Sequence, residues 1–200
     1  MAPRRFKGNP MKFRFLLPVM LAALCCACVT HIHSSVTENP PPEEPLSAFQ
    51  HFRLEPVFAA NSQVSKQTAA MAKISTNTQM KLERTVAGWE DKSPSGRTLK
   101  IEPCITELKF VSGTKRVFAG DFAGSSAVIM HLRLTDADTG KVIADPEFYQ
   151  RAAAEAGKWT FGGADNGMLV RISTVAQQYM QRNYDTAIGG PTGLDTSDKK

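Results

Sequence analysis

Apolar and polar side chains alternate most regularly between Val128 and Leu134, which is the pattern of a half-buried strand. The turn-forming sequence DADTGK follows, and 142–144 is apolar again, so a hairpin with a return strand is predicted. Upstream, 98–105 alternates in the same way, and 107–111 continues this pattern past an expected bulge. These segments predict several antiparallel strands.

Two other segments have the periodicity of helices. From Ser62 to Ala87 there is no Pro or Gly, and apolar residues recur at three-, four- and seven-residue steps. This pattern predicts one amphipathic helix of about seven turns, begun by Asn61 or Ser62 and ended by Gly88. Asp165 is expected to cap a final helix. The apolar stripe of that helix consists of Leu169, Ile172, Val175, Ala176, Tyr179 and Met180.

A first strand over 51–59 is expected near a sheet edge, because Pro56 cannot donate to a strand ladder. The order strand, helix, three strands, helix predicts an α+β domain over 49–184, with an antiparallel or mixed twisted sheet and two helices packed on one face. The segment 28–48 is rich in Pro, which predicts an extended tether that reaches about 60 Å. A disordered tail is predicted for 185–200.

Residues 1–27 have the composition of a signal peptide, and Met11 is a candidate for the true start. A short basic stretch precedes the apolar run Phe15–Leu24, which is too short for a permanent span of about 20 residues. The run ends in LCCAC, which holds three of the four cysteines of the chain. Ala27 before Cys28 resembles the lipobox of bacterial lipoproteins, in which the cysteine after the cleavage site is acylated.

Other interpretations of LCCAC are less consistent with its spacing. The chain departs from the typical lipobox at two positions, because Cys25 and Cys26 occupy the places of a Leu and a small residue. A zinc site would use these adjacent thiolates, which cannot both face one ion. A disulfide within so short a run is geometrically awkward, and a bond to Cys104 would leave an odd thiol. We therefore predict a lipoprotein signal with lipidation at Cys28, and ordinary secretory cleavage is the alternative.

Lipidation would decide where the protein works. Three acyl chains, palmitate among them, would hold Cys28 on the membrane permanently, because each buried CH₂ contributes about 0.8 kcal/mol. By analogy with bacterial lipoproteins, Val29 in place of Asp favours export to the outer membrane, with the domain facing the periplasm. Cys104 would remain as the one free thiol, so the folded domain could form no internal disulfide.

The net charge of +5 comes from the leader. Of 24 basic residues, five lie in 1–27, which leaves 19 basic against 19 acidic residues. The remaining chain is formally neutral and lacks the electrostatic footprint of a nucleic-acid-binding protein. The expected partners are the membrane, through the N-terminal lipid, and other envelope proteins or a second copy of the chain.

The sequence lacks recognisable catalytic motifs. Neither HExxH nor GxSxG is present, and the four histidines, His31, His33, His51 and His131, are scattered. We therefore expect no catalytic residue, no metal and no cofactor, and predict that the protein is not an enzyme. His31 and His33 are expected to be solvated in the tether.

Aromatic side chains crowd among glycines between 148 and 161. Aromatics and Arg are enriched at interface hot spots, so a recognition surface is one interpretation. In the other, the rings cover the sheet. The candidate interaction surface consists of Tyr149, Arg151, Trp159, Phe161, Asp165 and Asn166.

Two longer segments, ITELKFVSGTKRVFAGDFAGSSAVIMHLRL and DADTGKVIADPEFYQRAAAEAGKWTFGGADNGMLVRI, resemble an uncharacterised family of proteobacterial envelope lipoproteins, described only as a domain of unknown function. The resemblance covers about Phe52–Tyr184, and EFYQRAAA and WTFGGADNGML are its most recognisable parts. It implies an envelope location and a similar fold, but it supplies no active site.

Two functional hypotheses follow. The first is a lipid-anchored envelope protein that acts as a periplasm-facing assembly or interaction subunit. The alternative is a binding module for a small envelope ligand, such as a glycan or lipid, held in a pocket under 148–163.

Overall fold

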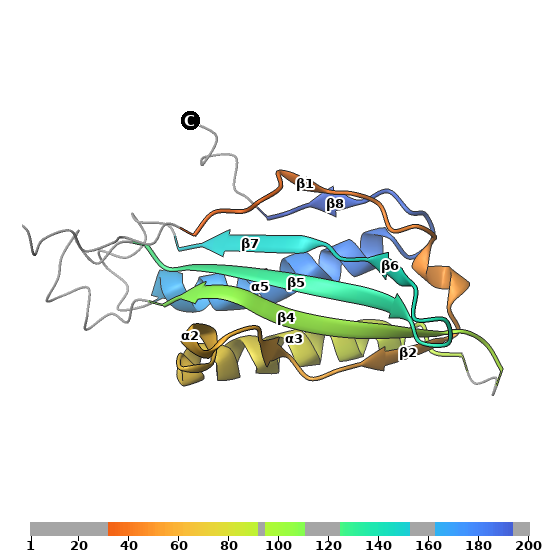
Figure 1. The fold of residues 1–200 in the computed structure, drawn as a ribbon, viewed down its shortest axis with the longest axis horizontal. Helices are drawn as coiled ribbons and strands as arrows, with labels where there is room; N and C mark the ends of the chain where they lie inside the picture. Colours follow the sequence, from red (N-terminus) through yellow and green to blue (C-terminus); the bar gives the residue numbers. More distant parts are fainter. Residues whose placement is uncertain (1–31, 92–94, 111–124, 153–162, 194–200) are drawn as a thin grey trace, which may run out of the picture. The chain divides into compact units, whose positions relative to one another are not determined.

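The computed structural model describes residues 32–91, 95–110, 125–152 and 163–193 (Figure 1). The strands are β1 (Glu38–Asn39), β2 (His51–Leu54), β3 (Phe58–Ala59), β4 (Thr98–Lys109), β5 (Ala127–Asp136), β6 (Val142–Ala144), β7 (Glu147–Arg151) and β8 (Gly190–Pro191). The helices are the 3₁₀ turn η2 (Leu46–Ala48), α2 (Ser62–Ser65), α3 (Thr68–Ala87) and α5 (Gly163–Arg182).

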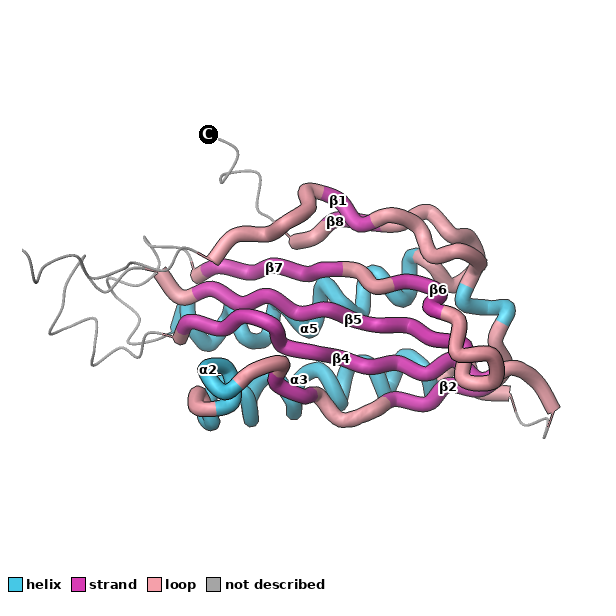
Figure 2. Tube along the Cα trace, in the orientation of Figure 1, coloured by secondary structure: helices cyan, strands magenta, loops and turns pink. Residues whose placement is uncertain are grey.

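Six of the strands form one mixed sheet with β4 and β5 at its centre. β2 and β3 run parallel to β4, whereas β5 pairs antiparallel with β4, β6 and β7. The two long helices, α3 and α5, lie side by side on one face of the sheet (Figures 1 and 2). The predicted α+β class, with a mixed sheet and two helices on one face, is confirmed.

The two central strands follow the predicted alternation closely. Their ladder extends from the Leu99–Asp136 pair to the Lys109–Ala127 pair, and its register shifts between Ile105 and Glu107. The expected bulge and the continuation of this strand are therefore confirmed. The hairpin after β5 is confirmed as well, and Gly140 in its turn has a φ of +74°, a conformation that glycine adopts without strain.

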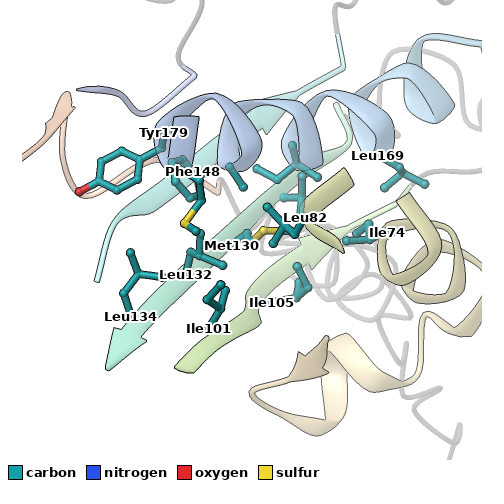
Figure 3. Close-up of a cluster of buried hydrophobic side chains, with 14 of the residues drawn as sticks. Ile74, Leu82, Ile101, Ile105, Met130, Leu132, Leu134, Phe148, Leu169 and Tyr179 are labelled. Atoms are coloured by element: carbon teal, nitrogen blue, oxygen red, sulfur yellow. The ribbon is translucent and has the colours of Figure 1, made fainter. Parts of the chain in front are cut away.

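The main apolar core lies between the sheet and the two long helices (Figure 3). Inward-facing side chains of β4 and β5, such as Ile101 and Leu132, meet Ile74 and Leu82 of α3. The predicted stripe on α5 is buried apart from Val175, which is half-buried against the same core. Each fully buried aliphatic side chain of this kind contributes about 1.5–3 kcal/mol.

The predicted single helix over 62–87 is broken into α2 and α3. Asn61 caps the first piece as predicted, because its Oδ1 accepts hydrogen bonds from the N–H groups of Gln63 and Val64, both at 3.0 Å. The break is at Gln67, whose side chain donates to the carbonyl of Leu108 and accepts from the N–H of Phe110 at 2.8 Å. The Gln67 side chain thus provides hydrogen-bond partners for two backbone groups at the end of β4. Its own backbone has a ψ of 56°, which is outside the range of an α-helix and interrupts the helix here.

The flanking segments differ from prediction. Residues 32–49, here called the N-terminal strap, and residues 183–193, called the C-terminal strap, run beside β7 and pair through β1 and β8 (Figure 1). Ile32, Asn39 and Leu46 are all buried. The prediction of an extended tether outside the folded domain over 28–48 is therefore wrong for 32–48, and that of a disordered tail is wrong for 185–193. Positions 28–31 and 194–200 lie outside the described residues.

Arg97 joins the N-terminal strap to the hairpin. Its guanidinium donates to both carboxylate oxygens of Glu44, at 2.7 and 2.9 Å, and to Oδ2 of Asp136, at 2.7 and 3.0 Å. It also lies 4.3 Å from the ring centroid of Phe49. These hydrogen bonds from Arg97 hold the pKa of Glu44 and of Asp136 below their usual values.

Both straps are held near the C-terminal end of α5, the first by Tyr179 of the helix and the second by Asn183, the residue that follows it. The Tyr179 hydroxyl donates to the carbonyl of Pro40 at 2.9 Å, and burial raises the pKa of Tyr179 to about 12. Asn183 uses its Oδ1 to accept from the N–H groups of Ile188 and Gly189, at 2.9 and 2.8 Å. Gly189 is required there, because its φ is +72° and a Cβ would lie 2.4 Å from the carbonyl oxygen of Asn39.

Candidate functional site

A row of side chains crosses the face of the sheet that the helices leave uncovered. The strand register places Phe58 beside Cys104, Cys104 beside His131, and His131 beside Glu147. The Cys104–His131 and His131–Glu147 pairs join antiparallel strands, across which neighbours have Cβ atoms about 4.5–5.5 Å apart. Phe58 at one end is 49% exposed, and Glu147 at the other is 7% exposed. This open-face row therefore brings an aromatic ring, a thiol, an imidazole and a carboxylate together.

Glu147 is the centre of a polar clamp on the N-terminal strap. Its Oε1 accepts hydrogen bonds from the Ser34 hydroxyl and the Ser35 N–H, and its Oε2 accepts from the Ser35 hydroxyl, all at 2.7 Å. Burial alone would raise the pKa of Glu147, but these hydrogen bonds outweigh it and hold the pKa below its usual value. Glu147 is therefore a charged acceptor with strong, short hydrogen bonds.

Asn39 closes the outer edge of β7. Its Nδ2 donates to the carbonyl of Glu147 at 2.7 Å, and its Oδ1 accepts from the N–H of the same residue at 2.9 Å. Two positions along, the N–H of Tyr149 donates to the carbonyl of Thr192 at 2.8 Å. Both straps thus use backbone groups of β7 that an edge strand would offer to another chain.

A second apolar cluster lies on the open face. It consists of Ile32, Ala127, Ile129 and Tyr149. Tyr149 is only 2% exposed, because Ile32 of the N-terminal strap covers it. The neighbouring Phe148 faces the helices and meets Tyr179 edge to face, with ring centroids 5.7 Å apart. The prediction of Tyr149 as a surface residue is therefore wrong, and the interpretation that these rings cover the sheet holds for this pair.

The other predicted interaction residues are dispersed or undescribed. Arg151 is exposed at the end of β7, where its Nη2 donates to the Ser125 hydroxyl at 3.1 Å. Asn166 is exposed on α5 and accepts from Lys73 Nζ at 2.9 Å. α5 begins at Gly163, so Asp165 lies within the first turn rather than at the predicted cap. Trp159, Phe161, Cys28 and the side chain of Asp165 lie outside the described residues.

The open-face row is poorly arranged for nucleophilic catalysis. His131 directs Nδ1 toward Asp145 Oδ1 at 3.3 Å and Nε2 toward Glu147 Oε2 at 3.6 Å, so both ring nitrogens face carboxylates. Burial, with a smaller contribution from Asp145, raises the pKa of the Cys104 thiol. A catalytic cysteine requires the opposite shift and a base directed at its sulfur. At neutral pH, Cys104 is therefore mainly a protonated thiol.

Two negative observations apply to the ranges that the structure describes. Within 32–91, 95–110, 125–152 and 163–193, no three His, Cys, Asp or Glu side chains are grouped to hold a metal ion. Across the same ranges, no helix combines the length and the apolarity that a bilayer span requires.

The exposed side of α3 offers a separate surface. A shallow depression follows this helix, and it is lined by Thr76, Gln79, Met80, Glu83, Arg84 and Ala87. Met80, one of these lining residues, is 48% exposed. An unbranched, polarisable side chain of this kind adapts to many contact shapes, which makes it common at binding surfaces.

Sequence reasoning missed the residues that form the clamp. Ser34, Ser35 and Asn39 occur in a Pro-rich stretch whose composition is typical of a linker. Their acceptor, Glu147, is more than 100 positions away along the chain. The one local signal is Glu147 itself, a carboxylate that opens the apolar strand EFYQR and therefore needs partners if it is buried.

Comparisons with known proteins give distant structural likeness only. No model of a protein family matches the chain, and neither does any curated protein. Solved structures with some similarity include the PelC dodecamer from Paraburkholderia phytofirmans (7% identity, 69% of this chain and 96% of that one, TM-score 0.37). Others are the hypothetical protein CT253 from Chlamydia trachomatis (13% identity, 66% and 98%, TM-score 0.35) and a candidate lipoprotein from Caulobacter crescentus (12% identity, 69% and 91%, TM-score 0.32). TM-scores of this size do not establish a shared fold, and no function follows from them.

Proposed function

We propose that the protein is a lipid-anchored bacterial envelope protein, attached through Cys28, and that its domain is a periplasm-facing assembly or interaction subunit of the outer membrane. The leader that ends in LCCAC supports the anchor. The observation that carries the proposal is the clamp on the N-terminal strap. The described part of the domain begins at Ile32, four positions after Cys28, and Glu147 holds this strap with short hydrogen bonds.

The clamp suits a domain that is held from its N-terminus. A strap that merely followed a cleavage site would need no buried carboxylate to keep it in place, since burying a charge is costly unless it is fully hydrogen-bonded. A domain attached to a membrane through this strap would depend on such contacts to keep the strap beside β7. The clamp is therefore compatible with lipid attachment at Cys28.

A binding role fits the described surface better than catalysis does. Cys104 is mainly a protonated thiol at neutral pH, and His131 is engaged by two carboxylates. Exposed apolar side chains are available instead at Phe58 and Met80. Because both straps close the edge of β7, assembly would proceed through these side-chain surfaces rather than by extending the sheet at β7.

Metabolic labelling tests the anchor. Cells that express the wild type are grown with labelled palmitate, and we expect incorporation that Cys28→Ala abolishes. Cys26→Ala is the matched control, because it alters the same run but keeps the proposed acceptor. An unlabelled wild type, or label that follows Cys26 instead, would refute attachment at Cys28.

Native mass spectrometry and cross-linking test the interaction role. We expect discrete oligomers or a co-purified envelope protein, with cross-links from photoreactive residues placed at Phe58 or Met80. The same probe at Thr139, an exposed position in the hairpin turn, is the control. A monomer that instead carries a bound small molecule would favour the ligand-binding alternative. Tyr149 would not line the pocket of that alternative, because it is buried beneath Ile32.

A further inference from the structure

We propose that one end of the sheet lies against an anionic phospholipid surface and that the 136–141 hairpin points away from it. This inference rests on the lipid attachment at Cys28 proposed above. The end in question, here called the membrane end, is where β4 ends, β5 begins and β7 ends (Figure 1). It is marked by Ile32, Lys109, Ala127 and Arg151.

The length of chain between the anchor and the fold sets the distance. Four peptide units separate Cys28 from Ile32. Fully extended, they span at most about 14 Å between Cα atoms. An acylated cysteine lies at the level of the lipid headgroups, because its chains are buried in the bilayer. Ile32 must therefore stay within about 14 Å of the lipid headgroups.

The strap cannot lengthen this linker without breaking the fold. Ile32 is buried against Ala127 and Tyr149, and Ser34 and Ser35 are held by Glu147. Releasing more chain would expose that apolar cluster and leave a buried carboxylate without its donors, which is costly. The reach of about 60 Å expected for an extended tether over 28–48 is therefore replaced by about 14 Å.

The position of Ile32 decides which end of the domain is close to the lipid. In the strand register, Ala127 pairs with Lys109 on one side and with Arg151 on the other. All three residues therefore lie at the end where Ile32 packs. β5 has 10 residues, so at about 3.3 Å per residue the hairpin that follows it is roughly 30 Å farther along the sheet.

The charges at the two ends differ in sign and favour the same orientation. Among the described residues at the membrane end, Glu107 is outnumbered by basic residues, namely Lys73, Lys109, Arg151 and Arg171. At the hairpin end, Glu43 and Glu44 are engaged by Lys141 and Arg97. Arg97 also engages Asp136, and three more carboxylates lie at this end: Glu90, Asp91 and Asp138. An anionic phospholipid surface attracts the first end and repels the second.

Energy transfer from two labelled positions tests the orientation. The full-length lipidated protein, in a Cys104→Ser background, is labelled with a donor at Ser125→Cys beside the membrane end or at Thr139→Cys in the hairpin. It is reconstituted into vesicles of phosphatidylethanolamine and phosphatidylglycerol that carry an acceptor lipid. We expect several-fold stronger transfer from position 125 than from 139. Equal transfer, or stronger transfer from 139, would overturn the proposal.

A lengthened linker is the matched control. About 20 Gly and Ser residues inserted after Val29 leave the clamp intact but add roughly 25 Å of average reach. We expect transfer from position 125 to fall in this variant. Unchanged transfer would show that the linker length does not set the distance and would also overturn the proposal.

Flotation separates failure of the orientation from failure of the anchor. The wild type and Cys28→Ala are floated with the same vesicles. If the wild type fails to float, the proposed anchor is wrong and the orientation falls with it. If the wild type floats and Cys28→Ala does not, equal transfer from the two labels would refute the orientation alone.

Discussion

Glu147 of β7 accepts hydrogen bonds from both the backbone N–H and the hydroxyl of Ser35, a residue 112 positions earlier in the chain, at 2.7 Å each. A local sequence pattern cannot specify such a contact. It depends on a strap that lies across the sheet and on a carboxylate that is buried beneath it. The strength of this clamp can be measured directly.

Glu147→Gln is expected to destabilise the domain. The substitution keeps the shape of the side chain but removes the charge that strengthens the hydrogen bonds from Ser34 and Ser35. Hydrogen bonds to charged groups contribute about 1.5–3 kcal/mol, so we expect a loss of this order in the free energy of unfolding, measured in urea. Glu102→Gln is the control, because Glu102 forms a partly exposed ion pair with Lys100 that contributes about 0–1 kcal/mol. Equal losses for the two variants would show that the clamp contributes little.

Asn39→Ala is expected to open the edge of β7. The variant leaves the N–H and the carbonyl of Glu147 without their partner, which costs about 1–3 kcal/mol for buried groups. Amide hydrogen exchange at Glu147 should accelerate. Asn77→Ala removes one side-chain hydrogen bond, to the carbonyl of Lys73 on α3, and is the control. If exchange at Glu147 were unaffected by Asn39→Ala, another group would have to close this edge.

Arg97→Gln is expected to reduce the dependence of stability on pH in acid. The pKa values of Glu44 and Asp136 are lowered in the folded state. Their contribution is therefore fully present above the unfolded-state values of about 4.3 and 3.9, and it is lost as the pH falls through the lower folded-state values. The free energy of unfolding, measured across this range, should fall less steeply in the variant.

Lys100→Gln provides the control for that experiment. It removes one positive charge from the open face and leaves the Arg97 contacts in place. The pH profile of this variant should keep the slope of the wild type. Two variants with the same altered slope would mean that the loss of net charge, rather than the contacts with Arg97, causes the effect.

Cys104 is expected to react slowly with iodoacetamide. Its pKa is raised by burial and by Asp145, so the thiolate fraction at pH 8 is smaller than in an unfolded chain, for which the pKa is about 8.5. Alkylation should be slower in the native protein than in urea, and Asp145→Asn should accelerate the native reaction. Faster alkylation of the native protein would contradict the assigned direction of the shift.

Tyr179→Phe tests the contact between α5 and the N-terminal strap. It removes the hydrogen bond to the carbonyl of Pro40 at a cost of about 0.5–1.5 kcal/mol. In a spectrophotometric titration, the variant should lose the tyrosine that ionises near pH 12. Tyr184→Phe is the control, because its ring can still stack on Trp89, with centroids 4.3 Å apart in the wild type. A titration that Tyr179→Phe leaves unchanged would contradict the prediction.

The sequence predicts those parts of the fold whose determinants are local. Alternation located β4 and β5 together with the bulge after Ile105, and helical spacing located the buried stripe of α5. The break at Gln67 escaped prediction, because glutamine is a good helix former and its binding to the end of β4 is a tertiary effect. Position 149 was misjudged because an aromatic residue gives no sign of whether a distant segment, here Ile32, covers it.

The straps escaped prediction for a related reason. Composition predicts disorder where apolar residues are scarce, but a few side chains can hold such a segment if the rest of the fold presents the right groups. Asn39, Glu44 and Asn183 do so here, through Glu147, Arg97 and the backbone of the C-terminal strap. These contacts exist only after the sheet has formed, so they leave no periodic signal.

The pairing of β1 with β8 also has a consequence for biogenesis. The edge of β7 is closed by Asn39, which precedes β7 in the chain, and by Thr192, which follows it. A nascent chain therefore carries an open strand edge until residue 192 has been synthesised, and during that interval it needs protection from its neighbours. A copy that terminates before residue 190 would keep that vulnerable margin permanently.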